Sequence, residues 1–572
     1  CLTVLAQYFK HNIYFSETKK EMIGTDKKCI IETSDGAICG YIDTTDEGTF
    51  YKFKSIPYAK PPLGNLRFKP SSSAEPWKEV LDCTKDAPPP LSLTYKKEIV
   101  GSEDCLYIEV SSPNIIPEKP LPVMFWVGSC NFMYTIDNIL EPTLINKEDI
   151  VYVRCGFRLG PFGFLSINDF NAPGNNGIKD IILALKWVQK NILKFGGDPN
   201  NVTTFGTSSG AAIVHLMMLS PMANGLFHKS ILESACALNW WSLSRNPLES
   251  TMHLAHDMGI TKTDKLEVVE ELRKLPAIDI MKTHSSYMLK TIYKYDCFDA
   301  IFKPCVECFY EGQPVFLDKS PASILKSGNF NKIPFIIGSN NTESAVLEYM
   351  KDNFYEYEIY NKDISLLVPK CLTNVEGESK IKIGQKILNF YWEGEECLTE
   401  HTKKEYLQMR SDYNFLYYID KTIRTHIEVA PECAIYYYVM NYAGQWRVPK
   451  ELDFFNCSGH VAELPFIYRI KTSNSGYYGG SRDSIKTRKR VVKMWTNFAK
   501  YGNPTPDDDD PLLQITWDKV ENKDKLNFLS IDTDLTKGRN PFYERMHFWD
   551  KIHEEHLILK FITHFIDMGV DI

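Results

Sequence analysis

The chain has 572 residues and a formal net charge of −8, and 44% of its residues are hydrophobic and 24% charged. This composition is ordinary for a soluble globular protein, and the negative charge disfavours nucleic acid as a partner. No run of 18 apolar residues occurs, so we expect no transmembrane segment.

The length exceeds that of a usual single core and by itself predicts several domains. However, no linker rich in Pro, Ser or Gly divides the chain, and it contains no internal repeat. We therefore expect a loosely attached segment at 1–27, one domain with long inserted loops at 28–555, and a C-terminal tail helix at 556–572. The chain begins at Cys1 instead of Met. This favours a fragment or a processed form and leaves a cytoplasmic or a secreted location open.

The cysteines do not indicate a disulfide scaffold or a metal site. There are 15 of them, an odd number, at a density below that of small disulfide-rich proteins. Cys305 and Cys308 form a lone C-x-x-C pair. A structural zinc site needs further ligands at matching spacing, so we expect no metal there.

Predicted strands and helices alternate along the chain, most clearly in the first half. Strands are predicted at 29–33, 37–42, 50–53, 103–110, 122–127, 150–153, 202–205, 333–338 and 434–440. Helices are predicted at 180–193, 211–219 and 488–498. The first two strands form an N-terminal β-hairpin around an Asp-Gly turn. The alternation indicates an α/β fold with a central, mostly parallel sheet.

The strand at 202–205 leads into Gly206-Thr207-Ser208-Ser209-Gly210, which is followed by the apolar helix. Strand, sharp turn and helix are the context that a G-x-S-x-G nucleophile elbow requires. Such a turn holds the serine hydroxyl out at the carboxyl end of the strand. A simple Gly-Ser turn would give the same five letters, so the assignment depends on partner residues elsewhere.

Two later stretches can supply those partners. A nucleophilic serine needs a base to take its proton and a carboxylate to orient that base. Glu343 follows a predicted buried strand, and His460 lies in a later predicted loop, which is the chain order serine, acid, histidine of α/β-hydrolases. Taken alone, each would be read as an ordinary surface side chain.

Together these stretches resemble the type-B carboxylesterase and cholinesterase family. That family has an elbow like G-E-S-A-G, an acid stretch like G-x-x-x-x-E-G and a histidine stretch like G-x-x-H-x-x-E-L. Further matching stretches lie at 53–62, 102–107, 158–165, 195–199 and 495–504, so the resemblance runs from about residue 28 to about 550.

The resemblance implies an α/β-hydrolase fold and a serine hydrolase of small carboxylic esters, with no cofactor. It implies that Ser208 is the nucleophile, Glu343 the acid and His460 the base. Backbone N–H groups of Cys130, Asn131 and Ser209 match the family's oxyanion hole. Trp241 and Phe132 match its substrate pocket, although a core tryptophan is an equal reading of Trp241.

The resemblance also implies structural pairs. Cys83 and Cys105 match the family's first disulfide loop, although in a reducing compartment they could stay as thiols. Two pairs, Arg67 with Glu103 and Arg158 with Asp180, match its buried ion pairs.

The chain departs from the family in the oxyanion loop. Relatives have a sequence like H-G-G-G-F, and this chain has Gly128-Ser129-Cys130-Asn131-Phe132. Glycines there leave room for substrate and permit unusual backbone angles. Thr207 also replaces the family's glutamate beside the serine. The alternative function is therefore a non-catalytic relative that binds a protein partner, mediates adhesion or sequesters a ligand, whereas the complete triad favours hydrolysis.

Overall fold

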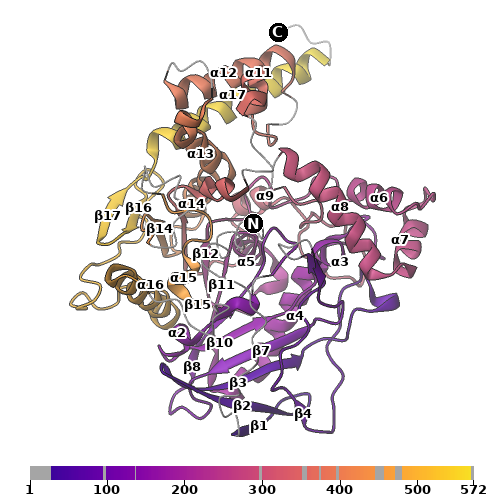
Figure 1. Cartoon of the computed structure of the whole chain (residues 1–572), viewed down its shortest axis with the longest axis vertical. Coiled ribbons are helices and arrows are strands. Elements are labelled where there is room, and N and C mark those ends of the chain that lie inside the picture. Colours follow the sequence, from indigo (N-terminus) through magenta and orange to yellow (C-terminus); the bar gives the residue numbers. More distant parts are fainter. Residues whose placement is uncertain are drawn as a thin grey trace.

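The computed structural model of the chain describes residues 27–93, 98–135, 137–295, 299–350, 357–372, 375–393, 398–444, 457–470 and 480–567. One large sheet runs through these residues, with helices on both of its faces (Figure 1). Apart from Lys27, the predicted N-terminal segment 1–27 lies outside the described residues.

The strands outside the main sheet have two residues each, as does β4 at its edge, and the other strands of the main sheet are longer. They are β1 (Lys28–Glu32), β2 (Ala37–Thr45), β3 (Gly48–Pro57), β4 (Leu81–Asp82), β5 (Ser92–Leu93), β6 (Ile99–Val100), β7 (Tyr107–Ser112), β8 (Leu121–Trp126), β9 (Leu140–Glu141), β10 (Val151–Cys155), β11 (Gly197–Thr207), β12 (Lys229–Glu233), β13 (Phe335–Asn340), β14 (Ile435–Met440), β15 (Arg469–Ile470), β16 (Asn527–Ile531) and β17 (Leu535–Arg539).

The helices fill most of the connections between the parallel strands. They are α2 (Thr143–Asn146), α3 (Gly160–Phe164), α4 (Asn176–Asn191), α5 (Ser209–Leu219), α6 (Pro247–Asp257), α7 (Lys265–Lys274), α8 (Ala277–Tyr295), α9 (Pro321–Ser327), α11 (Tyr357–Lys362), α12 (Gly377–Trp392), α13 (Lys403–Ser411), α14 (Tyr417–Val429), α15 (Leu464–Ile467), α16 (Arg482–Tyr501) and α17 (Tyr543–Asp567).

The main sheet has 13 strands, in the order β1-β2-β3-β7-β10-β8-β11-β12-β13-β14-β16-β17, with β4 paired beside β2. The pairs β1-β2, β2-β3, β3-β7 and β7-β10 are antiparallel, and β4 is parallel to β2. From β10 to β16 every neighbouring pair is parallel, and β17 returns antiparallel to β16. The α/β-hydrolase fold with an N-terminal hairpin region is thus confirmed.

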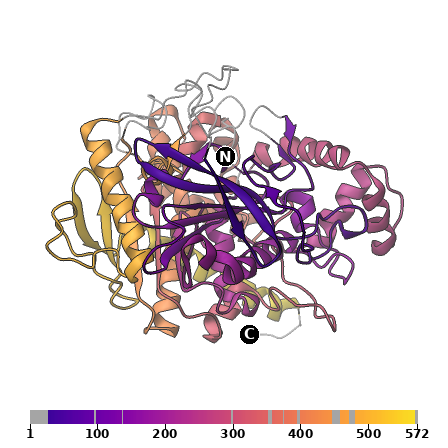
Figure 2. The same cartoon turned by 90° about the horizontal axis from the view of Figure 1, so that it is seen from below.

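Neighbouring residues of the central strands enter two separate cores. Along β8, Val123 and Phe125 pack into the core that contains α4 and α5. Met124 and Trp126 pack into the core that contains α16. Successive side chains of a strand point to opposite faces, so a continuously apolar strand is buried on both sides. Seen from below, the indigo N-terminal strands lie nearest the viewer and α16 lies at one side (Figure 2).

The two predicted buried ion pairs are present. Arg67 and Glu103 are joined by two hydrogen bonds, of 2.7 and 2.6 Å. Arg158 donates to Asp180 from Nε at 2.8 Å and from Nη2 at 2.7 Å. The Arg158 and Asp180 side chains are 3% and 0% exposed. Removing either residue would therefore leave the other as a buried charge without its partner.

The predicted disulfide between Cys83 and Cys105 is wrong for this structure, because both cysteines are free. Cys83 Sγ donates to the Ser55 carbonyl at 3.5 Å, towards β3. Cys105 is buried near Arg158 and Asp180 instead. Burial raises the pKa of the Cys83 thiol to about 12, and it also raises the pKa of Cys105. Both thiols therefore stay protonated at neutral pH.

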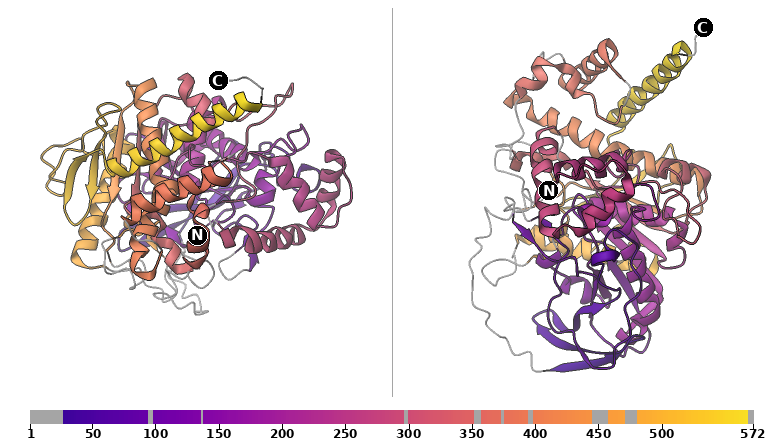
Figure 3. Two further views of the ribbon diagram at one scale, coloured as in Figure 1. Left: turned by 90° about the horizontal axis from the view of Figure 1, so that it is seen from above. Right: turned by 90° about the vertical axis from the view of Figure 1, so that its right-hand side faces the viewer.

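Helices α11, α12 and α17 gather at the end of the molecule away from β1, and α17 extends outward there (Figure 3). Helix α17 begins at Tyr543, ahead of the predicted tail helix at 556–572, and residues 568–572 lie outside the described part. None of the described helices combines the length and the apolar content that a membrane span requires. Helices α6, α7 and α8 form a separate group at one side (Figure 1).

Candidate active site

Ser208 lies in a sharp turn between β11 and α5. Its φ of 61° and ψ of −130° belong to a region that residues other than glycine rarely adopt. The flanking glycines allow the close approach of the chain. A Cβ at Gly210 would lie 2.2 Å from the Val127 carbonyl oxygen, and one at Gly206 would lie 2.8 Å from the Gly210 carbonyl carbon. The backbone matches the geometry of a nucleophile elbow.

Glu343 and His460 form a buried pair. Glu343 Oε2 lies 2.6 Å from His460 Nδ1, and the His460 N–H donates to the Glu343 carbonyl at 3.0 Å. The carboxylate is fully buried, and its Oε1 accepts the Asn340 N–H at 2.7 Å. Ser208 follows β11, Glu343 follows β13 and His460 follows β14. Ser208 and Glu343 come just after the ends of two parallel strands and so lie at the carboxyl edge of the sheet. The bond to Glu343 places His460 near the same edge.

Asn340 connects this pair to a second buried carboxyl. Its Nδ2 donates to Glu463 Oε2 at 2.7 Å and to Ser234 Oγ at 3.2 Å, and its Oδ1 accepts from Ser458 Oγ at 2.8 Å. The side-chain amide of Asn340 thus donates to Glu463, and the backbone N–H of the same residue donates to Glu343. Full satisfaction of such a network fixes the positions of its members.

A third buried carboxyl, Glu233, continues the network beneath the elbow. It accepts from Trp495 Nε1 at 2.7 Å and from the Thr207 hydroxyl. Burial, and then the charge of Glu463, raises the pKa of Glu233 to about 8. Burial, and then the charge of Glu343, raises the pKa of Glu463 to about 7. Near neutral pH these buried carboxyls therefore do not all carry a charge.

The oxyanion loop has an unusual backbone. Asn131 and Phe132 have φ of 53° and 56°, values that glycine adopts easily, asparagine tolerates and phenylalanine disfavours. The Cys130 N–H donates to the Tyr134 carbonyl at 2.9 Å. This amide is therefore already used inside the loop.

Ser209 ties the loop to α5. Its Oγ accepts the Phe132 N–H at 3.1 Å and donates to Ser129 Oγ at 3.0 Å. The elbow pattern of the resembled family, G-E-S-A-G, has alanine at this position, and alanine cannot make either bond. The Ser209 hydroxyl thus holds the oxyanion loop in place.

Gly128 stands where relatives have histidine, and Asp137 fills the space. A Cβ at Gly128 would lie 2.0 Å from Asp137 Oδ1. That oxygen accepts from Trp126 Nε1 at 2.8 Å. No side chain fits at 128 while Asp137 keeps this position.

A series of aromatic ring contacts ends at His460. Phe132 lies 6.3 Å from Trp241 between ring centroids, Trp241 lies 5.9 Å from Phe415, and Phe415 lies 4.7 Å from the His460 ring. Trp241 and Phe132 were predicted to line the substrate pocket, and the structure places both in this chain of contacts. Phe415 comes from the π-helical turn Asp412–Leu416 and had no signal in the sequence.

Asn414, in the same turn, holds two adjacent tryptophans. Its carbonyl accepts from Trp241 Nε1 at 2.9 Å, and its Oδ1 accepts from Trp240 Nε1 at 3.1 Å. Asn239 Nδ2 donates to the same carbonyl at 2.6 Å. The positions of both rings therefore depend on this one residue.

The carboxylesterase family profile matches residues 27–549 of the chain. Juvenile hormone esterase of Tribolium castaneum is 30% identical over 559 residues, covering 91% of this chain and 93% of the relative. Para-nitrobenzyl esterase of Bacillus subtilis is 29% identical over 532 residues, covering 90% of this chain and 97% of the relative. The crystal structure of juvenile hormone esterase from Manduca sexta, with OTFP covalently attached, has a TM-score of 0.79 and 26% identity, covering 92% of this chain and 100% of that chain. The chain therefore belongs to the carboxylesterase family of ester hydrolases.

Proposed function

We propose that the chain hydrolyses carboxylic esters through an acyl-enzyme formed on Ser208. The observation that carries the proposal is the buried hydrogen bond of 2.6 Å between Glu343 and His460 Nδ1. This bond fixes the imidazole so that Nε2 is the nitrogen that takes the serine proton. The strained elbow at Ser208 supports the same assignment, because residues keep such backbone angles mainly at functional sites.

In the first half-reaction Ser208 Oγ attacks the ester carbonyl while His460 removes its proton. The tetrahedral intermediate collapses to the acyl-serine, and His460 gives the proton to the departing alcohol. In the second half-reaction His460 deprotonates a water molecule, which attacks the acyl carbon. The carboxylic acid leaves and Ser208 regains its proton.

The developing oxyanion needs donors that are already in place. We assign the N–H groups of Ser209, at the N-terminus of α5, and of Asn131. Ser209 N–H has no acceptor among the residues that the structure describes. The partial positive charge at the N-terminus of α5 acts in the same direction. The Cys130 amide takes no part, because it bonds to Tyr134.

The alternative of a non-catalytic binding protein has less support. A protein that only bound a ligand would need neither the strained backbone at Ser208 nor the fully buried Glu343–His460 pair. Both features cost stability and serve a proton-transfer chain.

The test is hydrolysis of p-nitrophenyl butyrate by the wild type, Ser208→Ala and Glu343→Gln. Each variant is expected to lower kcat by roughly 10⁴-fold or more. A fluorophosphonate should add one label to the wild type and none to Ser208→Ala, as measured by intact mass. His256→Gln, which changes an exposed histidine, serves as the control. Turnover that survives Ser208→Ala in the folded protein would contradict the proposal.

A further inference from the structure

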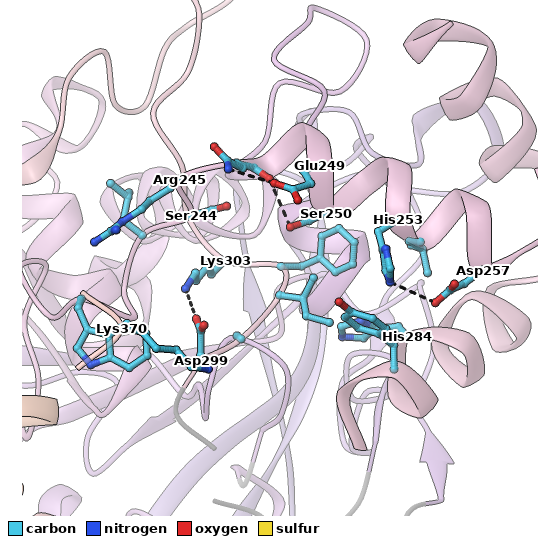
Figure 4. Close-up of a pocket in the computed structure, with 18 residues that line it drawn as sticks. Ser244, Arg245, Glu249, Ser250, His253, Asp257, His284, Asp299, Lys303 and Lys370 are labelled. Carbon is cyan, nitrogen blue, oxygen red and sulfur yellow. Dashed lines mark hydrogen bonds and ion pairs between the residues drawn. The ribbon is translucent and has the colours of Figure 1, made fainter. Parts of the chain in front are cut away.

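A cavity of about 490 Å³ lies between α6, α8 and residues 299–303. Figure 4 shows the side chains that line it. Its volume is within the range of small-molecule sites, roughly 300–1,000 Å³. Ser208, Glu343 and His460 are not among the residues that line it, within the described part of the chain.

One end of the cavity carries an excess of positive charge. Arg245 Nη2 donates to the Cys371 carbonyl at 3.4 Å, and the exposed side chains of Arg245 and Lys370 lie at the same end of the cavity (Figure 4). Both side chains line the cavity, and across the described residues neither forms an ion pair with a carboxylate. Helix α6 starts two residues after Arg245, so the positive end of its dipole lies at the same end.

The carboxylates of the cavity already have partners. Asp299 lies 2.5 Å from Lys303 Nζ, and Asp257 lies 3.7 Å from His253 Nε2. Glu249 accepts from Asn246 Nδ2 at 3.1 Å. Lys303 offsets the charge of Asp299, whereas Asn246 is neutral and His253 is charged only when protonated, so Glu249 and Asp257 keep their negative charges. Arg245 and Lys370 lie at the end of the cavity away from Asp257, and the excess of positive charge is confined to that end (Figure 4).

The walls between the two ends are apolar. Trp240, Leu243 and Phe302 line this part. His284 is 1% exposed, packs against Phe302 at 5.2 Å between ring centroids, and has an Nε2 without a hydrogen-bond partner in the described chain.

We propose that this cavity is a second binding site, distinct from the site around Ser208, for an amphipathic monocarboxylate such as a medium-chain fatty acid. The carboxylate meets Arg245 and Lys370, and the chain lies along Trp240, Leu243 and Phe302. Planar guanidinium groups bind carboxylates through charge-assisted hydrogen bonds, and the apolar chain gains from leaving water.

The site is separated from the proposed catalytic centre by the two adjacent tryptophans. Trp240 faces the cavity, whereas Trp241 contacts Phe132 and Phe415. Binding in the cavity does not depend on the proposed hydrolysis, so the two ideas can fail separately.

The experiment measures binding of decanoate and of decanol to the Ser208→Ala protein by isothermal titration calorimetry. Decanoate is expected to bind at one site about ten-fold more tightly than decanol, or more, because only decanoate carries the charge. Adding Arg245→Gln and Lys370→Gln should reduce the affinity for decanoate to that for decanol. Adding Leu243→Trp, which fills the apolar part, should weaken both ligands.

Arg482→Gln with Lys326→Gln removes two exposed cations elsewhere and should leave both affinities unchanged. Melting curves confirm that each variant is folded. The proposal is overturned if decanoate shows no saturable binding up to about 1 mM. It is equally overturned if the Arg245 and Lys370 changes, or Leu243→Trp, leave decanoate affinity as it was, because the ligand then binds elsewhere.

Discussion

The hydroxyl groups of Ser129 and Ser209 lie 3.0 Å apart and join the oxyanion loop to the first turn of α5. The same Ser209 oxygen accepts the Phe132 N–H. One side chain thus connects the residue after the proposed nucleophile to both ends of the altered loop. The bond explains how the loop keeps a defined shape without the family's glycines.

Ser209→Ala should lower both stability and turnover. The buried Phe132 N–H loses its acceptor, which costs about 1–3 kcal/mol of unfolding free energy. Urea denaturation measures the loss, and kcat with p-nitrophenyl butyrate measures the effect on the loop. Ser129→Ala is the matched comparison and should cost less, because the bond from Phe132 remains. Equal effects of the two changes would show that the Phe132 bond contributes nothing.

Asn131→Gly should raise kcat for ester hydrolysis. Glycine keeps the backbone N–H and adopts the φ of 53° without strain, while the buried carboxamide no longer occupies the loop. Asn131→Asp keeps the size but adds a negative charge, so it should lower kcat. If Asn131→Gly instead loses about 10²–10³ in rate, the carboxamide itself is the donor to the oxyanion. Adding Cys130→Gly should increase the gain of Asn131→Gly.

Asp180→Asn should cost about 3–5 kcal/mol of unfolding free energy, because it leaves the buried Arg158 charge without its partner. The comparison is Glu271→Gln, which breaks a pair with Lys274 at the surface. That change should have little effect on stability, because water and salt screen an exposed ion pair. Urea titrations of both variants decide the matter, and a loss for Asp180→Asn as small as that for Glu271→Gln would contradict the buried pairing.

Glu233→Gln should alter how stability depends on pH. The folded pKa of Glu233 is about 8, above the unfolded value of about 4.3. The contribution of Glu233 to stability is therefore fully present below about pH 4.3 and is lost as the pH rises through about 8. Glutamine does not titrate, so the variant should gain stability relative to the wild type between about pH 5 and pH 8. Urea unfolding at several pH values tests this, and parallel curves for the two proteins would refute it.

The elbow was predictable because its signal is local: a strand, two glycines and a helix lie within about 20 residues of one another. The pairing of Glu343 with His460 was not, since 117 residues separate them. Only the match of each residue to a family motif predicted that the two are partners. The same match to the family motifs predicted a disulfide for Cys83, but the Cys83 thiol donates to the Ser55 carbonyl instead.

Other features depend on tertiary contacts that no local pattern records. Helix α4 begins at Asn176, before the predicted start at 180, because its first turn buries polar residues and so lacks amphipathic periodicity. Lys179 in that turn pairs with Glu307 at 2.8 Å, far along the chain. The Ser129–Ser209 bond likewise spans 80 residues and requires left-handed angles in the loop.

The contact between Gly128 and Asp137 restricts how this loop can change. Any side chain at 128 would collide with the Asp137 carboxyl, whose oxygen also holds Trp126. Replacing Gly128 alone with the family's histidine would therefore force the Asp137 carboxyl to move and would break its bond with Trp126. The effects of substitutions at 128 and 137 on stability are thus expected to be non-additive, with the change at 128 costing less once position 137 has been shortened.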